Sequence, residues 1–371
     1  MFASSISKSG SVRGVLGKWF ALTALAIASL SASGQSLGLA QDTHAYAYSS
    51  GAESVAREAG VVASHDVHID GADWLRLQFD AAKLPNGATL RITSLQDGAQ
   101  QHLSAKTLAQ WQNTSAYFNG STVRVELLAA KAGRAGQFGI VKVLAGKPQP
   151  VTESQCGPND DRVASNVADR ARLLDVGCTA NLMAKGCFIT AGHCMSTPSL
   201  VDVVEFNVPK SNSNGSLNHP APKDQYVPTT NRKSFQGNIG NDWGVFTVAP
   251  NSETGKTPLQ AQGGGLRLAK AVPAVGAKVD IHGYGVDTGV DNQTQQYSTG
   301  PITSVDTNTT VLKYSADTEG GNSGSAVLTG GRVVAIHTNA GCTQSGGANQ
   351  GTLYTNAGFK KAFKAVCATP Q

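Results

Sequence analysis

The sequence predicts an all-β protein, and three observations support that prediction. Charged residues make up only 15% of the 371-residue chain and 42 residues are glycine, a composition typical of turn-rich structure. Many short runs alternate apolar with polar side chains and end at Gly, Asn, Asp or Pro, as half-buried strands do. Only residues 358–366 have a clear helical spacing, with Phe359, Phe363 and Val366 on one face.

Residues 1–40 predict a signal peptide. Three basic residues and no acidic one precede a twelve-residue apolar run at 19–30, which is too short to span a bilayer comfortably. We place cleavage after Ala40, with a cut after Gly34 or an uncleaved membrane anchor as the alternatives. No second apolar span follows, so we expect a secreted protein, extracellular or periplasmic, with no membrane segment after the signal peptide is removed.

The predicted organisation of the rest of the chain has four parts. Residues 41–65 are small and polar and are expected to form a loose lead-in. Residues 66–145 contain alternating strand-length runs such as "WLRLQFD" and "STVRVELLA", which predict a small β-sandwich. Residues 146–155 form a Pro-containing linker, and residues 156–371 a second β-rich domain.

The charge and the cysteines narrow the kinds of partner and cofactor. Removing the signal peptide takes three positive charges from the formal net charge of +5 and leaves +2, without a Lys/Arg cluster, so no nucleic acid partner is expected. An even number of cysteines in an exported chain favours disulfides. Zinc is the alternative, but no CxxC pair or HExxH is present, so no metal and no other cofactor is expected. The six cysteines are Cys156, Cys178, Cys187, Cys194, Cys342 and Cys367.

Three short motifs together suggest nucleophilic catalysis by serine. His193 lies in "CFITAGHC", Asp242 in "GNDWGVFTV" and Ser323 in "GGNSGSAV". A serine nucleophile needs a base and an acid that orients the base, and these three residue types occur in the order His, Asp, Ser. Each alone has a structural interpretation: a histidine beside a disulfide, a strand cap and a plain turn. The glycines around Ser323 allow a tight turn in which the N–H groups of Gly321 and Ser323 point at a developing oxyanion.

The pattern around the serine excludes one other hydrolase class. The α/β-hydrolase motif is Gly-x-Ser-x-Gly, and its catalytic residues follow in the order Ser, Asp, His. Here Ser325 stands in the place of the second glycine and the histidine comes first.

The region from Cys156 to the C-terminus resembles the chymotrypsin-fold serine proteases. The segment "CTANLMAKGCFITAGHC" (178–194) has the span of that family's histidine loop, which a disulfide closes, so the resemblance implies a Cys178–Cys194 bridge. It also implies two six-stranded antiparallel β-barrels with the site in the cleft between them, to which the helical spacing of residues 358–366 adds a C-terminal helix. The family usually has Ala where Gly192 stands.

The resemblance carries functions over to particular residues. His193, Asp242 and Ser323 correspond to the catalytic triad, and Gly321 and Ser323 to the oxyanion hole. The implied activity is a serine endopeptidase, a hydrolase that cleaves protein or peptide substrates through an acyl-enzyme. We expect a monomer. A catalytically silent protease-like binding protein is the non-enzyme alternative, although no triad residue is missing.

Departures from the trypsin-like branch point to bacterial relatives. Asn322 stands where that branch has an Asp that pairs with a newly cut N-terminal amine, so this activation route is not expected. "GGNSGSAV", "AIHTNAGC" and "GPITSV" look most like the glutamyl endopeptidase branch. There a histidine and a Thr or Ser hold the substrate carboxylate, which implies His337 and Thr318 here, and cleavage after Glu.

Asp317 keeps the specificity open. It stands six residues before the serine, the place that in trypsin-like enzymes forms a pocket floor for Lys or Arg. The alternatives are therefore Lys/Arg specificity or a small, broad pocket. His337 also has a structural interpretation, as a strand histidine bound to a backbone carbonyl.

The cysteine layout and the leader are also similar to lysyl endopeptidases. That similarity suggests Cys156–Cys342 and leaves Cys187 with Cys367, although four cysteines permit three pairings. The sandwich weakly resembles the β-rich leader of some of those enzymes. We therefore expect a zymogen whose sandwich is a removable pro-domain, with processing between Lys147 and Ser154; a retained module is the alternative.

Overall fold

A computed structural model describes most of the chain after residue 37, and the described residues belong to the unit that begins at Ala32. The predicted signal peptide up to residue 37 and the linker residues 149–154 lie outside the described residues. Within the described part, no helix is long and apolar enough to cross a membrane. The structure describes residues 38–51, 58–80, 82–129, 136–148, 155–195 and 202–367.

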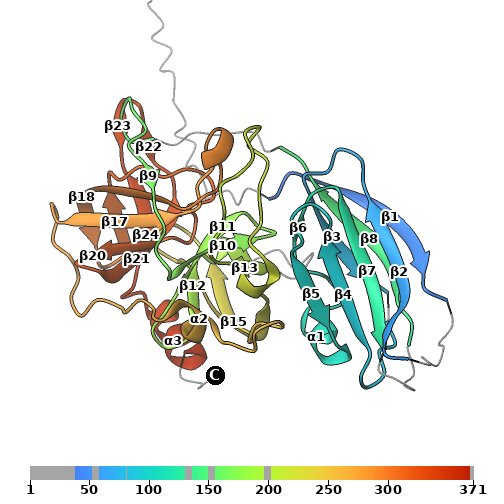
Figure 1. Cartoon of the computed structure of the whole chain (residues 1–371). Coiled ribbons are helices and arrows are strands. Elements are labelled where there is room, and N and C mark those ends of the chain that lie inside the picture. The colour runs from blue at the N-terminus through green and yellow to red at the C-terminus, as the bar shows by residue number, and fades with distance from the viewer. Residues whose placement is uncertain are drawn as a thin grey trace, which may run out of the picture. The chain divides into compact units, whose positions relative to one another are not determined.

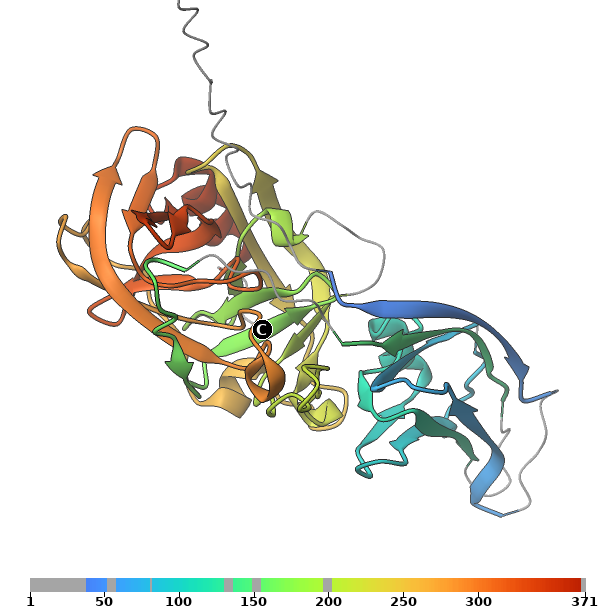
Figure 2. The same ribbon diagram turned by 90° about the horizontal axis from the view of Figure 1, so that it is seen from above.

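Residues 41–146 fold into two four-stranded antiparallel sheets, here called the N-terminal sandwich (Figures 1 and 2). One sheet of the sandwich has the order β1 (Gln41–Ser49), β8 (Gly139–Gly146), β3 (Trp74–Phe79) and β6 (Phe118–Asn119). The second has the order β2 (Gly60–His68), β7 (Thr122–Ala129), β4 (Thr89–Ser94) and β5 (Gln100–Leu103). A short helix, α1 (Ala105–Gln110), follows β5.

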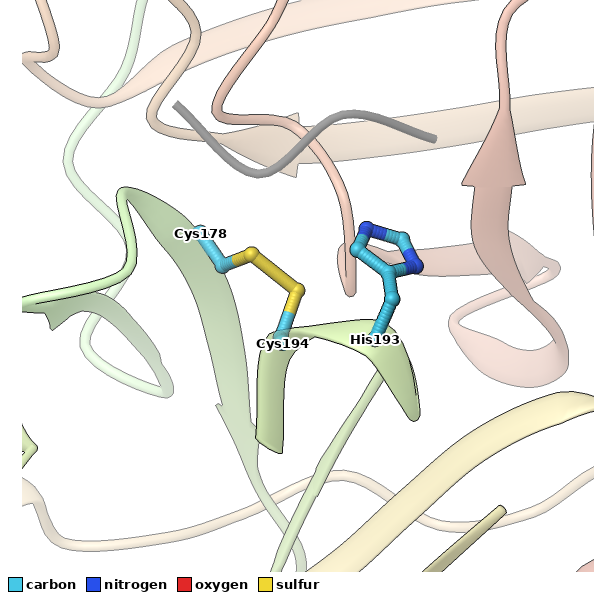
Figure 3. A group of neighbouring side chains, drawn as sticks. All are labelled: Cys178, His193 and Cys194. Atoms are coloured by element: carbon cyan, nitrogen blue, oxygen red, sulfur yellow. A yellow bond between two sulfur atoms is a disulfide. The ribbon is translucent and has the colours of Figure 1, made fainter. Parts of the chain in front are cut away.

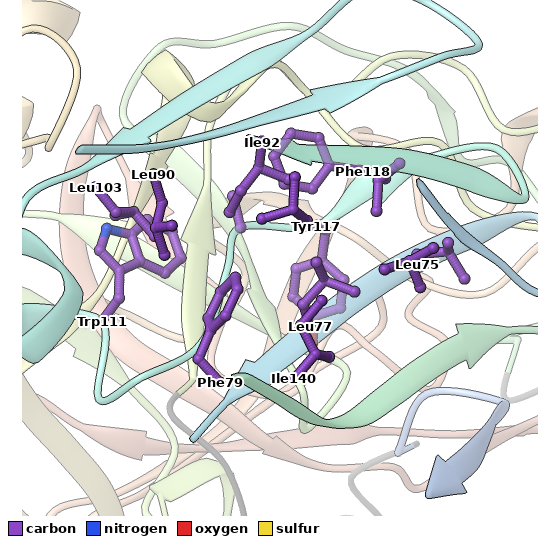
Figure 4. Packing of buried hydrophobic residues seen from close by; sticks show 14 of the residues in the cluster. Leu75, Leu77, Phe79, Leu90, Ile92, Leu103, Trp111, Tyr117, Phe118 and Ile140 are labelled. Atoms are coloured by element: carbon purple, nitrogen blue, oxygen red, sulfur yellow. The ribbon is translucent and has the colours of Figure 1, made fainter. Parts of the chain in front are cut away.

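The inward-facing side chains of both sheets form the core of the sandwich (Figure 4). In β7 the even-spaced residues Val123, Val125 and Leu127 are buried and the intervening residues are not, which is the period of two expected of a strand with one solvated face. Trp74 and Trp111 are each 1% exposed, so both belong to this core.

The prediction of a loose lead-in at residues 41–65 is wrong. Strand β1 and most of β2 lie there and pair with β8 and β7. Both are edge strands of their sheets. Edge strands bury fewer side chains, and here the inward positions are held by half-buried residues such as Tyr46 and Val62. The apolar alternation of these segments is therefore weak in the sequence.

Two seven-stranded antiparallel sheets follow. The first sheet, as we call it below, has the order β14 (Gln225–Tyr226), β13 (Val203–Glu205), β10 (Arg170–Leu174), β11 (Cys178–Leu182), β12 (Phe188–Thr190), β16 (Asp242–Val248) and β15 (Pro228–Gln236). The second has the order β17 (Lys278–Gly283), β20 (Ala326–Thr329), β21 (Arg332–Asn339), β24 (Asn349–Leu353), β19 (Val311–Tyr314), β18 (Gln296–Asp306) and β9 (Val163–Ala164).

Pairing of β17 with β18 closes six strands of the second sheet into a barrel, and the first sheet remains a curled half-barrel in the described pairings. The all-β, chymotrypsin-like prediction is confirmed. The predicted C-terminal helix is α3 (Ala357–Val366), which buries Phe359 and Val366. The sequence did not predict α1, α2 (Pro258–Gln262) or the 3₁₀ turns His193–Met195, Pro222–Asp224 and Gly289–Asp291, because each is too short to show a helical period. The small hairpin of β22 (Cys342–Thr343) and β23 (Gly346–Gly347) completes the described elements.

Candidate active site

The pairing of two neighbouring strands brings His193 to Asp242. Thr190 at the end of β12 lies opposite Gly244 of β16, so the turn that follows β12 reaches the first residue of β16. The backbone N–H of His193 donates to Asp242 Oδ1 at 2.9 Å, and its Nδ1 lies 2.5 Å from Asp242 Oδ2. The two residues are 4% and 5% exposed. Burial from water strengthens such a hydrogen bond and holds the imidazole in one orientation.

Close packing around this pair explains why a glycine precedes the histidine. A Cβ at residue 192 would lie 2.1 Å from the carbonyl oxygen of Phe235 and 2.7 Å from Asp242 Oδ1. The Ala that is usual in the family therefore does not fit this backbone. Asp242 is held from the other side by Thr352, whose hydroxyl accepts from the Asp242 N–H at 3.1 Å and donates to its carbonyl at 2.9 Å.

The cysteines that flank the histidine form a disulfide. Cys178 and Cys194 are joined with a Cα–Cα distance of 6.2 Å, and the His193 ring projects from the turn beside them (Figure 3). Their sulfur atoms and a His193 nitrogen lie within 4.8 Å of one another, as ligands of a metal would. Because the two sulfurs are bonded to each other, neither is a thiolate ligand, and this group does not fit a metal ion.

The other four cysteines also pair in the structure. The bridges are Cys156–Cys342 and Cys187–Cys367, with Cα–Cα distances of 4.6 and 5.3 Å. All three pairings agree with those that the family resemblances suggested.

Ser323 lies in the loop between β19 and β20, and that loop is tied to the first sheet. The Ser323 carbonyl accepts from the N–H of Thr179 at 2.8 Å. The same carbonyl oxygen lies 3.7 Å from Sγ of Cys194, the residue that follows His193 in the sequence. The Asn181 side chain donates to the carbonyl of Gly324 at 2.7 Å. These contacts place the serine beside the turn that carries His193.

The backbone N–H groups around Ser323 fall into two sets. Those of Asn322 and Ser325 donate to nearby carbonyls at 2.9 Å. Within the described residues, the N–H groups of Gly321 and Ser323 have no acceptor. Gly321 has φ +99°, and a Cβ there would lie 2.4 Å from the Tyr284 carbonyl oxygen. Two amide groups without a protein acceptor in one tight loop are suited to bind an oxyanion.

His337 lies in β21, and its backbone is hydrogen-bonded to the loop that contains Ser323. Its N–H donates to Ser325 O at 2.9 Å, and its carbonyl accepts from Gly324 N–H at 2.8 Å. The ring is 3% exposed, and its Nδ1 lies 2.6 Å from the Tyr314 hydroxyl. Burial, with a smaller contribution from nearby His193, lowers the pKa of His337 to about 3. In the free protein this imidazole is therefore neutral at physiological pH.

Asp317 has backbone partners far away in the sequence. Its Oδ1 accepts from the N–H of Cys156 at 2.6 Å and its Oδ2 from the N–H of Asp161 at 3.0 Å. The residue is 3% exposed, and the Asp317 carbonyl accepts from the Ser298 hydroxyl at 2.6 Å. Burial and the adjacent Asp317 raise the pKa of Asp161. The carboxylate thus anchors the start of the C-terminal half of the chain. The neighbouring Thr318 is 1% exposed.

A comparison with known families identifies the C-terminal half of this protein. The family model described as Trypsin matches residues 152–361, which is more than half of the chain. The chain belongs to the trypsin family. It is a chymotrypsin-like serine endopeptidase, a hydrolase whose substrates are proteins or peptides.

The solved structures that are similar to this chain are distant from it in sequence. A Glu endopeptidase in complex with MPD is 22% identical, with a TM-score of 0.45 over 58% of this chain and 100% of that chain. The protease Anisep from Arthrobacter nicotinovorans is 14% identical, with a TM-score of 0.44 over 56% and 99%. The thermostable serine protease AL20, from an extremophilic microorganism, is 16% identical, with a TM-score of 0.41 over 52% and 90%. No curated protein matches the chain.

Sequence reasoning missed several residues that support the site. Thr352 holds Asp242, Tyr314 holds His337, and the backbone of Cys156 and Asp161 holds Asp317. These partners are separated in sequence by 23 to 161 residues and belong to no local motif.

Proposed function

We propose that this protein is a secreted serine endopeptidase that cleaves after Glu, with Ser323 as nucleophile, His193 as general base and Asp242 as the group that orients the base. Asp242 accepts from the Nδ1 side of the ring, which leaves Nε2 to carry the lone pair. Ser323 Oγ attacks the scissile carbonyl carbon as its proton moves to Nε2. That proton then passes to the leaving amine as the C–N bond breaks, and water hydrolyses the acyl-enzyme in the same way. The N–H groups of Gly321 and Ser323 stabilise the oxyanion of each tetrahedral intermediate.

The His337–Tyr314 pair is the observation that supports an acidic substrate. Burial holds the pKa of Tyr314 well above its ordinary value, so its oxygen keeps the hydroxyl proton. The hydroxyl lies 2.6 Å from His337 Nδ1 but 3.5 Å from its other acceptor, the Gln350 carbonyl, so we assign its proton to Nδ1. His337 then carries its own proton on Nε2, where it can donate to a substrate carboxylate. A bound carboxylate also raises the pKa of the ring, so that a Glu substrate takes up a proton with it.

The contacts of Asp317 weigh against the Lys/Arg alternative. A pocket floor for a cationic side chain needs carboxylate oxygens that are available to it. Both oxygens of Asp317 already accept backbone N–H groups, from Cys156 and Asp161. We therefore assign Asp317 an anchoring role and His337, with Thr318, the substrate carboxylate.

The test uses matched peptides that differ only in the residue before the scissile bond: Glu, Gln, Lys or Leu. The wild-type protein is expected to have its highest kcat/KM for Glu. His337→Ala is expected to lower kcat/KM for Glu by about ten- to a hundredfold and to change the Leu peptide much less, because a charge-assisted donor is lost. Tyr314→Phe keeps the ring and removes only the hydroxyl, and its kcat/KM for Glu is expected to lie between those of the wild type and His337→Ala. A wild-type preference for Lys overturns the Glu assignment. A Glu preference that survives in His337→Ala overturns the role of His337.

Export and processing are part of the same proposal. Three disulfides fit an oxidising compartment, and the predicted signal peptide would direct the chain there. Sequencing the N-terminus of the exported protein tests both the predicted cut after Ala40 and the predicted processing between Lys147 and Ser154. A start at residue 1 in the exported form contradicts the signal peptide.

A further inference from the structure

Two reciprocal side-chain amides join the N-terminal sandwich to the first sheet. From the first sheet, Gln225 accepts from the N–H of Tyr117 at 2.9 Å and donates to its carbonyl at 2.9 Å. From the sandwich, Asn119 accepts from the N–H of His219 at 2.7 Å and donates to its carbonyl at 3.0 Å. Each amide thus satisfies both backbone groups of one residue on the other side. Gln225, Tyr117 and His219 are all buried.

A continuous row of buried polar and aromatic groups crosses the same boundary. The Arg76 guanidinium lies 4.8 Å from the centre of the Tyr117 ring, which stacks on the His219 ring at 4.5 Å and 8°. His219 Nδ1 lies 2.8 Å from Glu205, and the other oxygen of Glu205 accepts from Arg172 at 2.7 Å. Although burial opposes ionisation, His219 and Arg172 hold the pKa of Glu205 below its ordinary value. Without the sandwich, the first sheet would lose the ring that covers this ion group.

Apolar packing and peripheral hydrogen bonds extend the contact. Leu174, Val203 and Leu217 of the C-terminal half belong to the same buried cluster as the sandwich core. At the periphery, Gln41 donates to Asp175 at 2.9 Å, and His102 lies 2.9 Å from Glu253. A boundary that shares one apolar core and satisfies its buried backbone groups across both sides has the character of a permanent interface rather than of a transient domain contact.

The hydrogen bonds of this interface lie apart from Asp242, Ser323 and His337. Within the described chain, none of those made by residues 41–146 reaches Asp242, Ser323 or His337. We propose that residues 41–146 are a structural subunit of the protease that stays bound to the first sheet after the chain between them is cut. The partner surface for this subunit is the one centred on Gln225 and the His219 backbone. Cutting the linker would then complete processing without releasing the sandwich.

The experiment cuts the connecting chain and asks whether the two parts separate. A recognition sequence for a site-specific protease is inserted after Pro148, which is exposed, in a Ser323→Ala background that prevents self-digestion. After complete cutting, the protein is run on a size-exclusion column at about 1 µM, where partners with nanomolar Kd stay together. We expect one peak that contains both parts. Two separate peaks from the otherwise unaltered chain overturn the proposal.

Shape-conserving variants test which contacts hold the parts together. Gln225→Glu and Asn119→Asp each keep an acceptor and remove the donor, and each is expected to raise the Kd of the cut parts by roughly ten- to a hundredfold. Asn86→Asp makes the same chemical change at an exposed turn of the sandwich and is expected to leave the single peak intact. Equal release from all three variants overturns the role of the amide pairs. A variant that does not fold before cutting is set aside, and the result for the otherwise unaltered chain decides. Hydrolysis is not measured, so the outcome is independent of the proposed specificity.

Discussion

At the scale of single residues, Ser323 is a small side chain, 6% exposed, in a loop that backbone hydrogen bonds hold in place. Ser323→Ala is expected to abolish peptide hydrolysis, by a factor on the order of 10⁶, and to leave the unfolding free energy nearly unchanged. Ser345→Ala, at an exposed loop position, is the control and is expected to keep full activity. Turnover of a reporter peptide decides the matter, because more than about a few per cent of residual activity contradicts a triad nucleophile.

Asp317 offers a second test at this scale, since its two carboxylate oxygens accept two backbone N–H groups. Asp317→Asn leaves one N–H facing an amide NH₂ group, so we expect the unfolding free energy to fall by about 1–3 kcal/mol. The order of preference among Glu, Gln, Lys and Leu peptides is expected to stay the same. Urea unfolding and the peptide set measure the two effects. If the variant gains Glu cleavage at the expense of Lys cleavage, Asp317 belongs to the pocket and its anchoring role is wrong.

At the scale of elements, the Cys178–Cys194 bridge closes the segment that presents His193. Cys178→Ala with Cys194→Ala is expected to lower the unfolding free energy by roughly 3 kcal/mol, the chain-entropy value for a loop of about fifteen residues. The fold-change in kcat is also expected to be larger than that in KM, because the disulfide no longer holds the turn that carries His193. Removal of the Cys187–Cys367 bridge is the matched comparison, since that bridge ties residue 187 to the end of α3 and does not adjoin His193. Equal loss of kcat in both variants contradicts a special role for the first bridge.

Elements also show what the sequence could predict and what it could not. The histidine loop, the serine loop and α3 are local patterns, so their residues could be chosen from short motifs. Strands β1 and β2 were missed because edge strands bury little and leave a weak alternation. The partners of Asp317 and of His337 could not be predicted, because strand pairing and the ends of the chain bring them together over long sequence separations.

At the scale of the whole molecule, the sequence predicted two β-rich regions separated by a linker but no interface between them. The reciprocal pairs of Gln225 with Tyr117 and of Asn119 with His219 join residues about a hundred positions apart. A buried glutamine or asparagine has no sequence pattern that names its partner. The consequence is physical: two regions that share a core cluster and satisfy each other's backbone should unfold together.

That joint unfolding should depend on pH, because the folded chain buries histidine side chains that the unfolded chain exposes. Burial lowers the pKa of His337 to about 3 and also lowers the pKa of His219 at the interface, although Glu205 opposes the latter shift. An unfolded histidine binds its proton near pH 6.5, so the folded state holds fewer protons below that pH. The stability associated with these neutral rings is therefore fully present above pH 6.5 and is lost as the pH falls toward 3.

We expect the urea unfolding free energy of the Ser323→Ala protein to fall steadily between pH 6.5 and 4, in a single transition for both regions. The contribution of His337 to the full loss is on the order of 5 kcal/mol. His337→Phe and His219→Gln should each reduce the fall in unfolding free energy between pH 6.5 and 4. His68→Gln, at a side chain that is 52% exposed, should leave that fall unchanged. Intrinsic fluorescence reports both regions, because Trp74 and Trp111 lie in the sandwich and Trp243 in β16. If the unfolding free energy falls equally steeply between pH 6.5 and 4 in all three variants, or if two separate transitions occur at pH 7, this account is wrong.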